Sequence, residues 1–98
     1  MSINEIQQAM DEFVRMKGWY DNSSNKPQTA INMAKSICIE SAELLECFQW
    51  QNNPPKHAVA DELADVILYA AQLANVYDMD LSEAIADKIA RNHNRDWQ

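Results

Sequence analysis

The sequence predicts an all-α protein, a four-helix bundle-like domain. Its 98 residues include one glycine, Gly18, and almost no run of β-branched residues. Four stretches with helical spacing of apolar residues are separated by short segments rich in turn formers. A chain this short buries a modest share of its surface, so we expect self-association to enlarge the core.

The first helix is expected over residues 3–17, because Gly18 follows it and glycine accepts the left-handed conformation that ends a helix. The second helix is expected to begin near Pro27, a suitable first-turn residue, and to run to about Trp50. The loop between them has the sequence WYDNSSNKP.

The segment NNPPK breaks the chain again, with Asn53 as the expected N-cap and Pro54 as the first residue of the third helix. This helix is expected to run to about Tyr77. Asp80 and Glu83 have the spacing of a capping box and predict the start of a fourth helix, which runs towards Arg95.

Composition excludes several classes of function. The net charge of −7 argues against a nucleic-acid duplex as partner, because phosphate backbones require stripes of Lys and Arg. The apolar runs are too short to cross a membrane, and the opening MSINEIQQAM lacks the basic residues of an export signal. Cys38 and Cys47 point to nearly opposite sides of one predicted helix, so reduced thiols and a cytoplasmic location are expected.

Acidic residues recur at three-residue spacing on the second and third predicted helices. Glu40 and Glu43 form one pair, and Glu62 and Asp65 form another, with an offset of 22 residues between the pairs (40 to 62 and 43 to 65). On each helix the pair lies at the edge of the apolar stripe. Antiparallel packing of the two helices would therefore bring four carboxylates together at one seam.

Four clustered anions require compensation, and a divalent cation supplies it. All the candidate ligands are oxygens, and neither pair is followed by the Glu-x-x-His pattern of di-iron bundles. This set favours Mg²⁺ or Mn²⁺ over zinc, iron or copper. A solvated acidic face is the competing interpretation, and it is the more common one for a single pair.

The fourth predicted helix carries a polar, cationic face within about 100° of arc. Its members are Lys88, Arg91, Asn92 and Arg95. Basic residues also suit the dipole at a helix C-terminus, so the face alone does not indicate a phosphate site. Trp50 falls on the same side of the second predicted helix as Glu43, whereas Tyr69 has the spacing of a core aromatic residue.

The motifs ESAELLECFQW and ELADVILY together resemble the all-α nucleoside triphosphate pyrophosphatase superfamily, in its MazG-like and dCTP-pyrophosphatase-like branch. The resemblance runs from about Phe13 to Arg95. It implies one MazG-like nucleotide pyrophosphohydrolase domain over residues 1–98, which assembles as a homodimer or a dimer of dimers. The segment Asn25–Lys26–Pro27 departs from the family's His-x-Pro pattern.

The resemblance also implies residue roles. The magnesium ligands and catalytic carboxylates would be Glu40, Glu43, Glu62 and Asp65. The substrate would be contacted by Trp19, Trp50, Tyr69, Lys88 and Asn92, and Lys88 or Arg95 would neutralise the pyrophosphate that leaves. One of the four carboxylates, or Glu46, would act as general base.

The expected function is Mg²⁺-dependent hydrolysis of nucleoside and deoxynucleoside triphosphates to monophosphate and pyrophosphate. The expected role is housecleaning of the nucleotide pool, with dCTP as the first substrate to test. Two other classes remain open from the sequence: a helical interaction module with an acidic surface, and a sensor that binds nucleotides without cleaving them.

Overall fold

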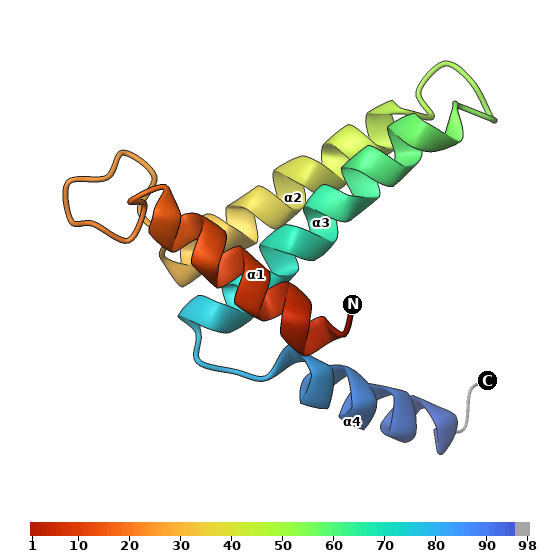
Figure 1. Cartoon of the computed structure of the whole chain (residues 1–98). Coiled ribbons are helices and arrows are strands. Elements are labelled where there is room, and N and C mark those ends of the chain that lie inside the picture. The colour runs from red at the N-terminus through yellow and green to blue at the C-terminus, as the bar shows by residue number, and fades with distance from the viewer. Residues whose placement is uncertain (96–98) are drawn as a thin grey trace.

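The computed structural model describes residues 1–95, which form four helices and no strand (Figure 1). The all-α prediction is thereby confirmed. The helices are α1 (Ile3–Met16), α2 (Ala30–Glu46), α3 (Lys56–Val76) and α4 (Leu81–His93). None of these helices is both long and apolar enough to span a bilayer.

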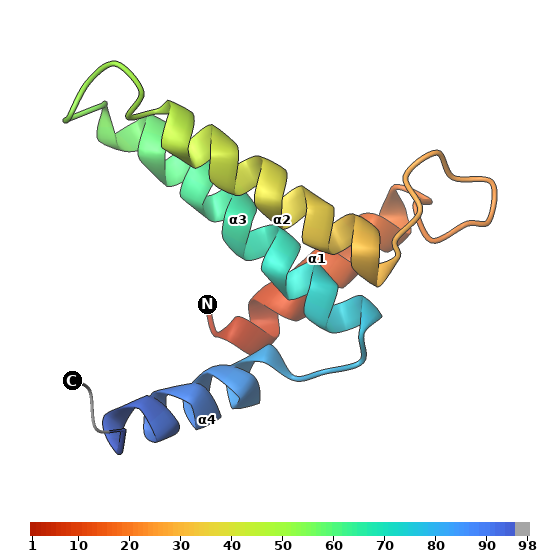
Figure 2. The same ribbon diagram turned by 180° about the vertical axis from the view of Figure 1, so that it is seen from behind.

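The helices are arranged around an antiparallel hairpin. α2 and α3 lie side by side, α1 crosses α3, and α4 packs against α1 (Figures 1 and 2). In both views α4 stands apart from the far half of the hairpin, so the described chain is elongated, with extents of 48 × 38 × 25 Å. The four helices therefore do not close around one shared core within a single copy.

The ends of α1 follow the local sequence. Ser2 and Glu5 form a reciprocal capping box, in which each side chain accepts a hydrogen bond from the other residue's backbone N–H. Gly18 has a φ of +75°, the left-handed conformation expected where it ends the helix. At the start of α4, Asp80 accepts a hydrogen bond from the Glu83 backbone N–H at 3.1 Å, as the sequence predicts.

Three helix boundaries differ from their predictions. α2 begins at Ala30 instead of Pro27, because the Thr29 hydroxyl caps it by accepting from the Asn32 backbone N–H at 3.2 Å. α2 ends at Glu46, four residues before Trp50. At the start of α3 the N-cap position is Pro55, not Asn53, and it makes no side-chain capping bond.

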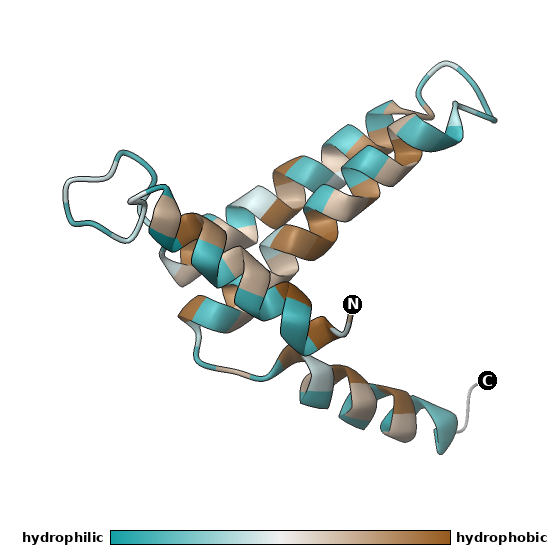
Figure 3. Ribbon diagram, in the orientation of Figure 1, coloured by the Kyte–Doolittle hydropathy of each residue, from teal (hydrophilic) through white to brown (hydrophobic). Residues whose placement is uncertain are grey.

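The core within one copy is small. Its buried residues are Val14, Met33, Ala71, Ala74 and the polar Gln72. Several large apolar residues whose helical spacing is that of a core stripe are exposed instead, among them Phe48 (43%), Leu63 (49%) and Tyr77 (63%). Figure 3 shows apolar patches along both helices of the hairpin and along α4. A single copy therefore leaves much of its apolar surface in water.

Candidate metal centre

The hairpin brings acidic residues from two helices together. Glu40 lies on α2, and Glu62 and Asp65 lie on α3 one turn apart. One carboxylate oxygen from each of the three lies within 4.8 Å of the others. In the described part of the chain, this is the one group of three or more His, Cys, Asp or Glu side chains with metal-ligand spacing. Antiparallel packing thus produces the juxtaposition that the matched pairs predict.

Two oxygens in this cluster lack a hydrogen-bond partner among the described residues. They are Oε2 of Glu40 and Oε2 of Glu62, and both atoms are buried. Burial, the hydrogen bond with Glu43 and the charges of Glu43, Asp65 and Glu62 together raise the pKa of Glu40 to about 7. Burial and the adjacent Glu43 also raise the pKa of Glu62. These two oxygens are thus left without a compensating donor in the described part of the chain.

The unpaired oxygens fit a divalent cation. A buried carboxylate oxygen without a donor costs free energy, and a cation placed among these oxygens removes that cost. The three close ligands are all carboxylates, and Glu43 lies beside them, interacting with both Glu40 and Glu62. Hard oxygen ligands without nitrogen or sulfur suit a hard cation.

Tyr69 extends the site along α3. It lies four residues, or about one turn, after Asp65. Burial raises the pKa of Tyr69 above its ordinary value near 10, and the charges of Glu40, Asp65 and Glu43 raise it further. The hydroxyl therefore stays protonated at neutral pH and remains a hydrogen-bond donor next to the acidic cluster.

An apolar cavity of about 430 Å³ opens beside Asp65. It lies between α1, Trp19 and α3. The Trp19 and Phe13 rings meet edge to face in its wall, with centroids 5.5 Å apart and planes at 84°. The residues lining it are Ala9, Met10, Phe13, Trp19, Asp65, Leu68 and Tyr69.

A second cavity, of about 340 Å³, shares Met10, Trp19 and Tyr69 with the first. The Lys26 ammonium lies 4.6 Å from the Trp19 ring centroid, a cation–π contact in the wall of this second cavity. Trp19 thus contributes to two adjacent cavities next to the acidic cluster.

Two features of these cavities were not predicted from the sequence. Met10 and Phe13 have the spacing of an apolar helical stripe, and periodicity does not distinguish a core wall from a cavity wall. Lys26 had a visible signal, since it is one of only eight basic residues and stands in the segment that departs from the family pattern.

Trp50 lies elsewhere. It was expected on the same helical face as Glu43, but α2 ends at Glu46 and Trp50 is 89% exposed in the connection to α3. The prediction from helical spacing that Trp50 shares a helical face with Glu43 is therefore wrong. Within one copy, Trp50 lines neither of the two cavities around Trp19.

The polar face of the last helix is also remote within one copy. Lys88 and Asn92 lie on α4 and Arg95 follows it, and α4 packs against α1 instead of the hairpin (Figure 2). Lys88 and Arg95 are exposed, and Asn92 is half-buried. The structure thus brings together Glu40, Glu43, Glu62, Asp65, Tyr69 and Trp19, but not Trp50, Lys88, Asn92 and Arg95.

Three comparisons agree on the relatives of this chain. A pyrophosphatase of known crystal structure from Archaeoglobus fulgidus superposes with a TM-score of 0.76 and 34% sequence identity, over 93% of this chain and 88% of that chain. The dCTP pyrophosphatase 1 proteins of Mus musculus and Rattus norvegicus are 29% and 28% identical over 104 residues. The chain spans about 58% of the length of these two relatives.

The family assignment follows from the extent of the match. Residues 35–96 match the MazG-like family, and this segment is more than half of the chain. The segment includes most of α2 and all of α3 and α4. It therefore contains the four acidic residues of the site. The chain therefore belongs to the MazG-like family.

Proposed function

We propose that this chain is a nucleoside triphosphate pyrophosphohydrolase, which releases pyrophosphate by cleaving between the α and β phosphates. The observation that carries the proposal is the cluster of Glu40, Glu62 and Asp65, with two buried oxygens that lack a partner. The names of the similar proteins support it, since all three are pyrophosphatases. Residues 1–98 would act as one catalytic domain.

The proposed cofactor is Mg²⁺, with Mn²⁺ as a substitute, held by Glu40, Glu43, Glu62 and Asp65. A divalent cation at these oxygens would neutralise phosphate charge and acidify water at neutral pH. The set contains only carboxylates, which favours these hard cations over zinc.

The chain's own residues would divide the remaining work. Glu43 is the fourth proposed cation ligand, and because it lies beside the three mutually close oxygens it is also the first candidate to accept a proton from the attacking water. The protonated Tyr69 hydroxyl next to the cluster would donate to the substrate. The attacked atom is the α-phosphorus, and pyrophosphate leaves.

The base of the nucleotide would occupy the cavity of about 430 Å³ next to Asp65. An aromatic ring in an apolar cavity offers a stacking surface, and Trp19 with Phe13 provides one. Because Asp65 also lines this cavity, a base bound there leaves its phosphates beside the acidic cluster. A pyrimidine deoxynucleotide such as dCTP is the first candidate, on the names of two relatives, and housecleaning of the nucleotide pool is the proposed role.

The active form would be a homodimer or a homotetramer. The outer face of α2 carries Ile31, Lys35, Cys38, Ala42 and Leu45 at alternating spacings of four and three residues, the pattern of a coiled-coil seam. Leu45 is 72% exposed and Ile31 is 62% exposed, and shallow apolar grooves lie along this face. A second copy would cover the seam. Assembly is also the route by which Trp50, Lys88, Asn92 and Arg95 would approach an acidic cluster.

The test is pyrophosphate release from a panel of nucleoside and deoxynucleoside triphosphates, with Mg²⁺ and with chelator, together with identification of the nucleotide product. Cation-dependent formation of monophosphate and pyrophosphate supports the proposal, and the ranking of the panel gives the base preference. Diphosphate and phosphate as products would refute attack at the α-phosphorus. Stabilisation by nucleotide and Mg²⁺ without product would identify a sensor instead of an enzyme.

A further inference from the structure

A buried glutamine joins α3 to the loop that carries Trp19. Gln72 is fully buried, and its Nε2 donates to the Tyr20 hydroxyl and to Oε1 of Gln28, each at 3.1 Å. Gln28 in turn donates from Nε2 to the backbone carbonyl of Lys26 at 2.8 Å. The loop is therefore fixed to α3 on both sides of its tip, at Tyr20 and at Gln28.

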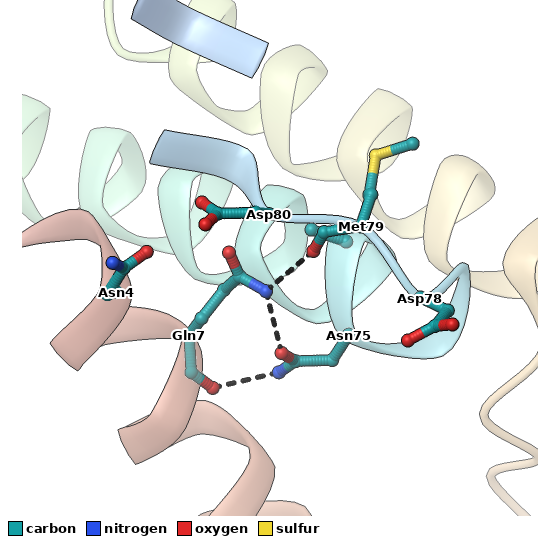
Figure 4. Close-up of a pocket in the computed structure, with 7 residues that line it drawn as sticks. Asn4, Gln7, Asn75, Asp78, Met79 and Asp80 are labelled. Carbon is teal, nitrogen blue, oxygen red and sulfur yellow. Dashed lines mark hydrogen bonds between the residues drawn. The ribbon is translucent and has the colours of Figure 1, made fainter. Parts of the chain in front are cut away.

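The same hydrogen-bonded chain continues in the other direction. Oε1 of Gln72 accepts from Nδ2 of Asn75 at 3.1 Å. Asn75 and Gln7 then form a reciprocal pair between α3 and α1: Gln7 Nε2 donates to Asn75 Oδ1 at 3.0 Å, and Asn75 Nδ2 donates to the Gln7 carbonyl at 2.8 Å. Figure 4 shows these two side chains turned towards each other at the edge of a cavity of about 380 Å³.

The other end of this series of hydrogen bonds holds the start of α4. Gln7 Nε2 donates to the Met79 carbonyl at 3.0 Å (Figure 4). Gln7 Oε1 accepts from the Leu81 backbone N–H at 2.8 Å. Leu81 is the first residue of α4, whose early N–H groups have no partner inside the helix. The side chain of Gln7 therefore fixes where α4 leaves α1.

We call Gln7, Asn75 and Gln72 the amide chain. It joins two segments that are far apart in the sequence, namely the loop with Trp19 and the start of α4. The amide chain also lies on the same face of α3 as the candidate metal site. Asp65, Tyr69 and Gln72 follow one another on this helix at spacings of four and three residues and so share one face. The loop is thus positioned from the same helical face that supplies a cation ligand.

Stability alone is a poor reason for this arrangement. A hydrogen bond adds only about 1 kcal/mol net, and apolar residues of similar shape at all partners would be close to neutral. What a connected set of buried amides adds is direction, because each bond requires its partner at one distance and one angle. Apolar packing at the same positions would allow the loop and α4 to slide.

We propose that the amide chain is a positioning network for the nucleotide site. It holds the Trp19 and Lys26 loop at one end and the α4 segment at the other in a fixed relation to Asp65. The network therefore affects the affinity for the nucleotide without touching it. This inference rests on the proposed function, and it assigns to Gln7, Asn75 and Gln72 a role that no metal ligand or cavity-lining aromatic residue supplies.

Two adjacent glutamines on α1 provide a matched test. Gln7 belongs to the amide chain, whereas the hydrogen bond of the Gln8 side chain is to the exposed Glu12, at 3.5 Å. We expect Gln7→Ala to raise KM for the best substrate about fivefold, the equivalent of one net hydrogen bond, with kcat within about twofold. Gln8→Ala should leave both constants unchanged.

A measurement without substrate separates this inference from the proposed function. In a ¹⁵N-correlated spectrum, Gln7→Ala should shift the Trp19 indole resonance, assigned through Trp19→Phe, and Gln8→Ala should not. If the wild type releases no pyrophosphate, the proposed function fails while the indole resonance still reports on the network.

Further variants guard against misfolding. Gln7→Glu keeps an acceptor for the Leu81 N–H but loses the donor to Asn75. It should therefore have the same raised KM as Gln7→Ala if the complete amide chain is needed to position the nucleotide site. Recovery of the wild-type KM in Gln7→Glu would mean that Gln7 only caps α4. Tyr20→Phe removes one acceptor from Gln72 near the loop and should also raise KM. Equal KM values and equal indole shifts for Gln7→Ala and Gln8→Ala would overturn the inference.

Discussion

The stability of the cation-free protein should fall as the pH rises, and Glu40 should cause much of the fall. Its Oε2 is buried and has no hydrogen-bond partner within the described residues 1–95. Burial, helped by the adjacent Glu43, raises the pKa of Glu40 from its ordinary value of 4.5 to about 7. The perturbation is Glu40→Gln, which keeps the shape of the side chain and removes its charge.

The sign follows from proton binding. Below pH 4.5 the Glu40 carboxyl is protonated in both the folded and the unfolded chain, and above about pH 7 it is ionised in both. Between these values the folded chain binds more protons, so folding stability is lost as the pH rises through this window. Midway through the window, Glu40 alone accounts for roughly 0.9 of a proton taken up on folding. The raised pKa of Glu62 acts in the same direction.

The assay is urea unfolding of chelator-treated protein across this pH window, at one fixed protein concentration. The wild type should lose stability with rising pH, and Glu40→Gln should lose distinctly less. Asp87→Asn, at an exposed acid on α4 outside the cluster, is the control and should follow the wild type closely. Free Mg²⁺ at about a hundred times its dissociation constant should stabilise the wild type by about 2.7 kcal/mol and Glu40→Gln by less.

Two results would refute this reasoning. One is a chelated wild type whose stability is constant or increases across the window. The other is a Glu40→Gln variant that retains the full dependence on pH, which would place the titrating group elsewhere.

Three further predictions concern the metal ligands, the base cavity and assembly. Asp65→Asn should reduce pyrophosphate release by more than about a hundredfold while the helical circular dichroism is retained, since loss of a ligand exceeds the effect usual for outer-shell residues; full activity in this variant would remove Asp65 from the site. Trp19→Ala should raise KM roughly 5- to 150-fold, the range expected for one lost base–aromatic stack, and Trp19→Phe should raise it less; equal KM values in initial-rate measurements would argue against stacking on this indole. Leu45→Lys should lower the molar mass measured by light scattering, because Leu45 is 72% exposed on the proposed seam of α2; an unchanged mass would place the interface on another face.

The four helices and the clustering of acidic side chains between α2 and α3 were predictable from the sequence for clear physical reasons. One glycine and four apolar periodicities admit few alternatives to helices. The spacing of Glu40 and Glu43 on one helix, and of Glu62 and Asp65 on the next, needed only an antiparallel hairpin to bring them together. Local capping signals, such as Asp80 before α4, depend on neighbours in the sequence and were therefore visible.

The placement of Trp50 was not predictable in the same way. Helical periodicity continues through CFQW, but the backbone leaves the α-helix after Glu46 as it turns towards the two prolines before α3. Boundaries of this kind depend on the conformation of the loop that follows the helix, and helical spacing carries no information about that conformation. The wheel also could not separate the two apolar faces of α2, one against α3 and one exposed, because both have helical spacing.

The amide chain was invisible for a different reason. Gln7 lies 68 residues before Asn75 in the sequence (7 to 75), and an isolated Gln or Asn on a helix is ordinary surface. Only the crossing of α1 over α3 makes them partners. Side-chain chemistry that depends on a crossing angle has no signature in local spacing.

The isolated chain is incomplete in two ways, and both involve α2. Glu40 faces α3 and carries a buried oxygen without a partner in residues 1–95, whereas its neighbour Ile39 is 57% exposed on another side of the helix. A cation would compensate the first and a second copy would cover the second. Each ligand restrains the same helix, so either one reduces the entropy that the other must remove. Cation affinity and self-association should therefore be linked, and by reciprocity Mg²⁺ should tighten assembly by the same factor by which assembly tightens Mg²⁺ binding.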